Sequence, residues 1–445
     1  MQIYRQTSPI HGVNQPVIYN TQQPPKGEDT KREMRLTKSL LQLQPWHQTL
    51  KTLKSTQLHR LAEATGVKSS GTKGALVERL EGEIPLCECP FLLDSELGGD
   101  AMKSGTSEKS AKKSTEMSIL SIDMGIRNLA FAHLLVRPHS RTSIPDKAKA
   151  QARTRTETKT AEVTLNAWRR LDITNDGIPS TFPGLAEEAK TTQSSTLTSG
   201  SESKENAKEK DTFSPPLYAH HAYTLLTTLL QTYKPTHILI ERQRFRSAGG
   251  SAVQEWTLRV GVFEGMLYTV LYTLARQGFF THAGTGTGAG AGAGDGNRGI
   301  TVPVPLAKGV EPSRVVRYWE DRVLSPSASE EEEGKKKRKT SKEGKKAKID
   351  VVGGWLSDAG ETGGGDISTS LSVGNDVELQ NTVNTYLAKW RGKREKSKEK
   401  TLKKDIGKLD DLADCFLQGM TWLEWQIIRG RVAREGVDFL FEDGR

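Results

Sequence analysis

The chain has 445 residues, of which 35% are hydrophobic, and a formal net charge of +10. This length predicts two or more domains, and the low hydrophobic share indicates that part of the chain stays outside a packed core. The positive charge favours a polyanionic partner such as nucleic acid. No apolar run reaches the roughly 18 residues that a membrane span needs, so no membrane association is expected. The 3 cysteines are too few for a disulfide framework and favour a reducing compartment.

The first 35 residues are expected to be disordered or to form a weak transit segment. Residues 1–27 contain no Asp or Glu, as is typical of organelle transit peptides. Several prolines in the same stretch oppose the amphipathic helix that such peptides form, so the signal is incomplete.

Residues 36–90 are expected to form a small helical module. Two helices are predicted between residues 50 and 82. The segment LKSTQLHRLAEATGVKSSGTKGALVERL, at 53–80, resembles the SAP motif, a DNA-binding helical hairpin. A generic helical hairpin is the alternative interpretation. The resemblance implies that three basic side chains reach DNA phosphates, namely Lys68, Lys73 and Arg79.

An α/β domain is predicted over residues 115–430, and it begins with three strands. Apolar runs at 117–124, 129–136 and 161–173 predict these strands. The short break at 125–128 predicts a hairpin, so the three form an antiparallel meander.

Strands and helices alternate after the meander, which predicts parallel pairing and therefore a mixed sheet flanked by helices. The expected strands are 236–241 and 300–305, and the expected helices are 216–233, 253–278, 313–320 and 408–428.

Four polar or glycine-rich stretches interrupt the domain and are expected to be disordered insertions, because they cannot bury enough apolar surface to offset the entropy of ordering. They lie at about 137–160, 187–213, 283–298 and 322–400. The third holds a formal G-x-G-x-x-G, which follows a linker rather than a strand, so no nucleotide cofactor is expected. The basic run KKKRK in the fourth fits a nuclear signal, a DNA-binding tail or a solvated loop.

Carboxylates stand at the ends of several predicted elements. Asp123 ends the first strand, and Glu241 ends the strand at 236–241. Asp410 and Asp411 share one helix face with Asp414, at spacings of four and three residues. Clustered carboxylates repel unless cations neutralise them, and oxygen-only ligands suit Mg²⁺ or Mn²⁺.

Each carboxylate alone also has an ordinary structural interpretation. Asp123 is compatible with a tight turn, Glu241 with a surface ion pair, and the helix aspartates with a solvated N-terminal turn. The order of strand-Asp, strand-Glu and helix-Asp-Asp is more specific than any one of them.

The motifs SIDMGIRNLAFAHL, ILIERQRFRS and KLDDLADCFLQGMTWLEWQ closely resemble the fungal mitochondrial Holliday junction resolvases of the ribonuclease H-like superfamily. The resemblance implies a homodimeric, Mg²⁺-dependent endonuclease of the mitochondrial matrix that makes paired nicks in four-way DNA junctions; Mn²⁺ and nuclear localisation are the alternatives. It assigns catalysis to Asp123, Glu241, Asp410 and Asp414, with Asp411 competing for the third position.

The segment after Glu241 is expected to contact junction strands, through Arg242, Gln243, Arg244, Phe245 and Arg246. Structural salt bridges are the alternative role for its arginines. Two other functions fit parts of the pattern. One is a non-catalytic SAP-type DNA-binding protein. The other is an actin-like ATPase, which needs a second D-x-G hairpin that only SDAGETGGG offers.

Overall fold

The computed structural model describes residues 46–89, 116–139, 160–173, 215–243, 255–277, 304–323, 341–359, 369–392 and 406–441. All of them belong to one compact unit, Trp46–Arg445. The expected transit segment and the expected insertions at 187–213 and 283–298 lie outside the described residues, as does most of 137–160. Within the described part, none of the helices has the length and hydrophobicity that crossing a membrane requires.

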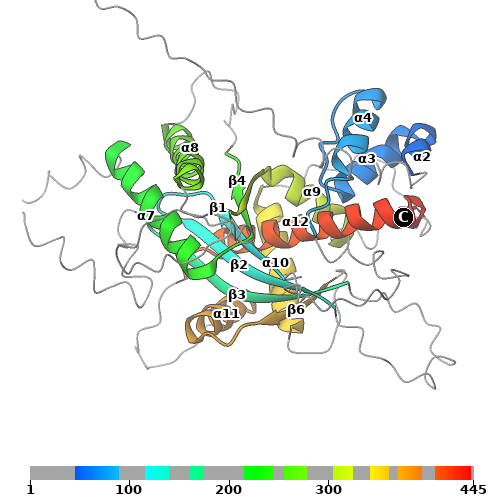
Figure 1. Ribbon diagram of the computed structural model, residues 1–445. Helices are drawn as coiled ribbons and strands as arrows, with labels where there is room; N and C mark the ends of the chain where they lie inside the picture. Colours follow the sequence, from blue (N-terminus) through cyan, green and yellow to red (C-terminus); the bar gives the residue numbers. More distant parts are fainter. Residues whose placement is uncertain are drawn as a thin grey trace, which may run out of the picture. The chain divides into compact units, whose positions relative to one another are not determined.

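A six-stranded mixed sheet forms the centre of the fold, in the order β5-β4-β1-β2-β3-β6 (Figure 1). The antiparallel pairing of β1 with β2 and of β2 with β3 confirms the predicted meander. The pairs β1–β4 and β4–β5 are parallel, as expected, and β3 also pairs in parallel with β6, a strand that was not predicted. This confirms the predicted mixed sheet. The strands are β1 (Met117–Asp123), β2 (Leu129–Pro138), β3 (Ala161–Leu171), β4 (His237–Glu241), β5 (Leu306–Val310) and β6 (Thr369–Val373).

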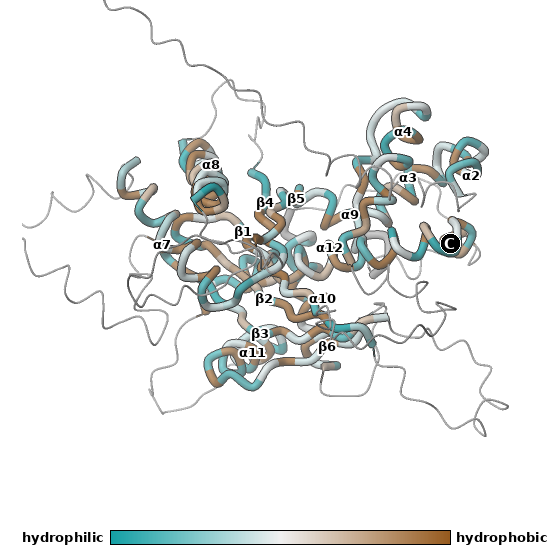
Figure 2. The backbone as a smooth tube through the Cα atoms, in the orientation of Figure 1, coloured by the Kyte–Doolittle hydropathy of each residue, from teal (hydrophilic) through white to brown (hydrophobic). Residues whose placement is uncertain are grey.

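Helices cover both faces of this sheet, which is why its central strands are almost continuously apolar (Figure 2). On one face, Leu120 and Ile122 join a cluster with α7 (Pro215–Tyr233) and α8 (Glu255–Arg276). On the other face, Ile119 packs with the remaining helices. These are α9 (Pro312–Val323), α10 (Ser341–Asp358), α11 (Val377–Trp390) and α12 (Leu409–Glu435).

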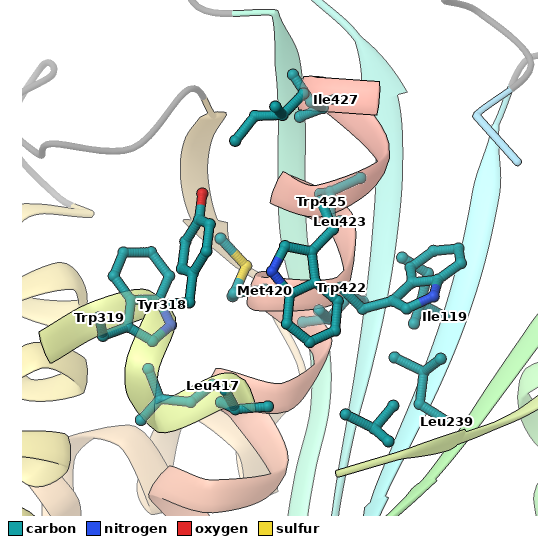
Figure 3. Packing of buried hydrophobic residues seen from close by; sticks show 14 of the residues in the cluster. Ile119, Leu239, Tyr318, Trp319, Leu417, Met420, Trp422, Leu423, Trp425 and Ile427 are labelled. Carbon is teal, nitrogen blue, oxygen red and sulfur yellow. The ribbon is translucent and has the colours of Figure 1, made fainter. Parts of the chain in front are cut away.

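Among the described helices, α12 has the most buried residues, and it runs past the predicted end at residue 428 to Glu435. Figure 3 shows its Trp422 and Trp425 between the sheet residue Ile119 and Tyr318 of α9. Between Leu412 and Ile428 only Asp414 is not buried, so this part of the helix is enclosed on every side. Because α12 contacts β1, β2, β3 and β4, its first turn is fixed relative to the sheet.

The N-terminal module consists of α2 (Trp46–Thr52), α3 (Ser55–Ala64) and α4 (Lys73–Glu83), so it has one helix more than predicted. Its leucines belong to the same hydrophobic cluster as α12. Arg429 of α12 donates to the Thr65 carbonyl at 2.7 Å, and Arg314 of α9 donates to the Gly66 carbonyl at 2.9 Å. The module is therefore part of one continuous core.

The expected disorder over 322–400 is wrong for a large part of that stretch. It contains α10, β6 and α11, and β6 extends the sheet beside β3. The polar composition masks a few apolar residues at helical spacing that reach the core. They are Val351, Val352, Trp355 and Leu356 in α10, and Leu379, Val383 and Tyr386 in α11.

Of the strand expected at 300–305, residues 300–303 lie outside the described residues, 304 and 305 are not in a strand, and β5 begins at Leu306. Proline has no backbone N–H, so Pro303 and Pro305 are poor members of a hydrogen-bonded strand. The ladder with β4 begins just after them, where the Leu306 N–H donates to the Thr236 carbonyl at 2.9 Å.

We predict that the free energy of unfolding falls as the pH drops from about 6.5 towards 4. Buried His133 sits between Ser118 Oγ, at 2.7 Å, and Asn166 Nδ2, at 2.9 Å. Burial lowers its pKa to about 4. Because the folded pKa lies below the unfolded value of about 6.5, this stabilisation is complete above pH 6.5 and is lost as the pH falls towards 4.

Denaturation at pH 7 and pH 5 measures this effect. His133→Gln, which cannot be protonated, should lose less stability over this interval, by on the order of 2 kcal/mol. The exposed His139 is the control, since His139→Gln should keep the wild-type profile. A wild-type profile for His133→Gln would contradict the prediction.

Candidate active site

Asp123 and Glu241 meet at one edge of the sheet. The parallel register of β1 and β4 places Ile122 opposite Ile240, so the next residue of each strand lies at the same carboxyl edge. The Glu241 carboxylate accepts hydrogen bonds from the Met124 N–H at 3.2 Å and from Gln243 Nε2 at 3.2 Å. The two acids therefore meet because β1 and β4 are neighbouring parallel strands.

The beginning of α12 brings its aspartates to the same edge. Trp168 of β3 donates through its ring N–H to the Leu412 carbonyl at 2.9 Å. Gln418 lies one turn after Asp414, and its Nε2 is 3.2 Å from the Ile122 carbonyl and 3.4 Å from the Leu239 carbonyl. These contacts fix the aspartates of α12 relative to the ends of both β1 and β4.

The proximity of these acids changes their protonation. Burial raises the pKa of Asp123 well above its ordinary value, and a hydrogen bond and the negative charge of Glu241 raise it further. The charges of Asp414 and Asp411 act in the same direction. Burial also raises the pKa of Asp414 to about 6, against the opposing effect of Lys348. A cation placed among these groups would relieve their repulsion.

Two lysines of α10 pair with aspartates of α12. Lys345 Nζ lies 2.6 Å from Asp410 Oδ2, and Lys348 Nζ lies 2.7 Å from Asp414 Oδ1. Burial tends to raise the pKa of Asp410, but the hydrogen bond and charge of Lys345 hold it below its ordinary value. These partners were not predicted from the sequence, because they belong to the lysine-rich tract that was expected to be disordered.

Asp411 has a different cationic partner. Arg170 Nε of β3 lies 3.0 Å from Asp411 Oδ2, and the same guanidinium donates to Asn128 Oδ1. Burial nevertheless raises the pKa of Asp411. Asp123 therefore interacts electrostatically with Asp411 and Asp414, whereas Asp410 faces Lys345.

The donor chemistry of the cluster fits a hard divalent cation, because its members offer only carboxylate oxygens. Within the described residues, however, no group of three or more His, Cys, Asp or Glu side chains is arranged to hold a metal ion. The ammonium groups of Lys345 and Lys348 contact oxygens of Asp410 and Asp414. The right ligands are thus gathered, but two of them are engaged by lysines.

One further acid, which was not predicted from the sequence, contacts the segment after β4. Glu264 of α8 accepts a hydrogen bond from the Gln243 N–H at 3.1 Å, and burial raises its pKa. A lone glutamate in the apolar run VFEGMLY was the available signal. The N–H of Arg242 donates to the Val310 carbonyl at 2.8 Å. Arg244, Phe245 and Arg246 lie outside the described residues.

The three basic residues of the module have different surroundings. The Arg79 guanidinium donates to the carbonyls of Lys68 and Ser70, at 3.0 Å for Ser70, so it stabilises the turn between α3 and α4. Lys68 lines a cavity of about 130 Å³ together with Arg314 and other residues of α9. Lys73 is exposed in the first turn of α4.

The strand order and the flanking helices define a mixed α/β protein with acidic residues gathered at one edge of its sheet. The chain belongs to the family described as mitochondrial resolvase Ydc2 / RNA splicing MRS1, whose model matches residues 119–432. It is 27% identical over 215 residues to the cruciform cutting endonuclease 1, mitochondrial, of Schizosaccharomyces pombe (strain 972 / ATCC 24843). That match covers 48% of this chain and 60% of the relative's length.

A solved structure is also similar, that of the yeast mitochondrial Holliday junction resolvase Ydc2. It is 19% identical in sequence, with a TM-score of 0.41 over 87% of this chain and 99% of that one.

We predict that Gln418→Leu lowers both stability and activity. The variant loses the side-chain amide that donates to the Ile122 carbonyl of β1 and the Leu239 carbonyl of β4. Leaving a buried polar group without its hydrogen bond costs about 1–3 kcal/mol. Thermal denaturation measures the loss of stability, and metal-dependent DNA cleavage measures the displacement of the aspartates.

Gln426→Leu is the matched control, since Gln426 is also buried in α12 but accepts a hydrogen bond from the Glu88 N–H. It should lose similar stability and keep cleavage below the melting temperature. Equal cleavage by the two variants would show that Gln418 does not position the site.

Proposed function

We propose that this chain is a structure-selective endonuclease that resolves four-way DNA junctions by metal-dependent hydrolysis of phosphodiester bonds. The observation that carries the proposal is the convergence of Asp123, Glu241 and the first turns of α12 at one edge of the sheet. Membership of a family described by a mitochondrial resolvase supports it, as does the name of the S. pombe relative.

Asp123, Glu241 and Asp414 are the proposed ligands of Mg²⁺, with Mn²⁺ as a substitute. Asp411 is the preferred fourth acid, because its charge acts on Asp123, and Asp410 is the alternative. When bound, the metal supplies an activated water and stabilises the leaving oxygen. The chain itself positions the acids: Gln243 and the Met124 N–H orient the Glu241 carboxylate.

The proposed DNA surface includes the module and the segment after Glu241. Lys68, Lys73 and Arg242 are available for phosphate contacts, whereas Arg79 contributes by holding the module's turn in place. Arg244, Phe245 and Arg246 remain predicted contacts.

A homodimer in the mitochondrial matrix completes the proposal. Large hydrophobic side chains are exposed along α8, including Leu258 at 46%, Val262 at 50% and Tyr272 at 63%. Such a stripe is typical of an interface, and a two-fold dimer would match the symmetry of a four-way junction. The mitochondrial family description supports this localisation over the nuclear alternative.

A role in RNA splicing without catalysis is the second candidate, because the family description also names MRS1. Like the non-catalytic DNA-binding alternative, it leaves the clustered, half-buried acids without a chemical role. The actin-like alternative is disfavoured, since Ser357 and Asp358 end a helix rather than a strand.

One assay separates these functions. The full chain is incubated with a labelled four-way junction, a linear duplex of the same sequence and a structured RNA, with and without Mg²⁺, and ATP turnover is followed in parallel. We expect paired nicks in the junction only with metal. Saturated binding without nicks would support a non-catalytic protein, and preferential binding of RNA would support the splicing role.

A further inference from the structure

The two lysines that reach the acidic cluster come from one helix. Lys345 and Lys348, here called the lysine pair, stand three residues apart on α10, while Asp410 and Asp414 stand four apart on α12. Residues at both spacings share a helix face, so two facing helices form both ion pairs together. Buried Val352 and Trp355 hold the next turns of α10 in the core. The pairing therefore belongs to an anchored helix.

The two lysines differ in their exposure to water, whereas Asp410, at 16%, is less exposed than Asp414. The Lys345 side chain is 58% exposed, whereas that of Lys348 is 23% exposed and its partner Asp414 is 34% exposed. Lys348 thus pairs with Asp414, and the charge of Asp414 acts more strongly on Asp123 than that of Asp411 does and also interacts with Glu241. A divalent ion bound by Asp414 would stand within a few ångströms of this ammonium group, and like charges at about 4 Å repel strongly away from bulk water.

We propose that the lysine pair acts as a resident counter-cation of the acidic cluster and that divalent metal binds by displacing it. The proposal rests on the proposed function, because it takes the cluster to be a metal site. It follows from the two contacts that occupy oxygens of Asp410 and Asp414 with ammonium groups. It also gives a role to the tract KEGKKAK, because its lysines set the metal concentration at which the site fills.

Equilibrium binding of Mn²⁺ to the full chain, measured by electron paramagnetic resonance without DNA, tests the proposal. Lys345→Met with Lys348→Met should bind Mn²⁺ at least about tenfold more tightly than wild type, since metal no longer competes with two ammonium groups. Lys346→Met is the matched control, because Lys346 is exposed on the same helix and no ion pair joins it to the cluster. It should change the affinity less than about threefold.

Variants that keep the positive charge distinguish displacement of the lysine pair by metal from an effect of altered packing of α10. Lys345→Arg with Lys348→Arg should stay close to the wild-type affinity. If the double methionine variant is unstable, the single Lys348→Met variant carries the test, with circular dichroism confirming its fold. In EDTA the methionine variants should melt at lower temperature than wild type, and Mn²⁺ should raise their melting temperature by more than it raises that of wild type.

The outcomes separate this proposal from the proposed function. Mn²⁺ binding that depends on Asp123 but is unchanged or weakened in the methionine variants overturns the exchange and leaves the metal site standing. Mn²⁺ binding that is absent, or that Asp123→Asn leaves unchanged, overturns both. Tighter binding in the methionine variants without junction cleavage by wild type supports the exchange and overturns the nuclease.

Discussion

Asp123→Asn is expected to abolish nicking of four-way junctions, by about a thousandfold or more, while the fold and junction binding stay intact. Asparagine keeps the size of the side chain and one carbonyl oxygen but removes the negative charge. Metal affinity and activation of a water both depend on that charge. Nicking at saturating Mg²⁺ and gel-shift binding in Ca²⁺ measure the two properties separately.

The same variant should be more stable than wild type in metal-free buffer near pH 7. Burial and neighbouring acids raise the pKa of Asp123 in the folded protein. A group with a raised folded pKa contributes stability at low pH and loses it as the pH rises through that pKa, so the charge that Asn removes is unfavourable at neutral pH. The advantage should disappear in acid.

Asp376→Asn is the matched control, since Asp376 caps α11 by accepting from the Leu379 N–H at 2.9 Å, and Asn caps helices equally well. Its nicking should equal that of wild type. If Asp123→Asn nicked at a similar rate, Asp123 would be a turn former instead of a metal ligand.

The centre of the fold could be predicted from the sequence because its signals are local. Two apolar runs separated by four residues specify the β1–β2 hairpin, and Asp123 and Glu241 end strands that are visible in the sequence. The alternation of strands and helices indicated parallel pairing, but not that these two strands are neighbours, which depends on contacts across 118 residues.

The surroundings of the acids could not be predicted, because they come from segments whose composition resembles disorder. Only a few apolar residues of α10 reach the core, and the glycines and lysines around them dominate the pattern. Lys345 and Lys348 are indistinguishable from solvated lysines until the helix is placed against α12. The same limit applies to Gln418, since a glutamine in an apolar helix does not reveal its acceptors.

Gly66→Ala is expected to destabilise the whole protein, by about 2–5 kcal/mol. Gly66 has a φ of +67°, and an added Cβ would lie 2.2 Å from Cδ2 and 2.4 Å from Cε3 of Trp425 in α12. The left-handed conformation costs about 1–2 kcal/mol for any other residue, and overpacking adds about 1–3 kcal/mol. Trp425 in turn packs edge-on against Tyr318 of α9, so the strain reaches the core.

Differential scanning calorimetry distinguishes this coupling from an independently folded module. Because the module shares a hydrophobic cluster with α12, Gly66→Ala should move a single transition of the entire chain to lower temperature. Gly74→Ala is the control within the same module: no heavy atom lies within 4 Å of its added Cβ, and alanine favours the α4 helix by about 1 kcal/mol. It should leave the transition unchanged or raise it. A separate transition at lower temperature in Gly66→Ala, with the main transition and junction nicking unchanged, would contradict this coupling. It would show that the module folds independently and that Arg429 and Arg314, which bind the Thr65 and Gly66 carbonyls, only attach it to the rest of the protein.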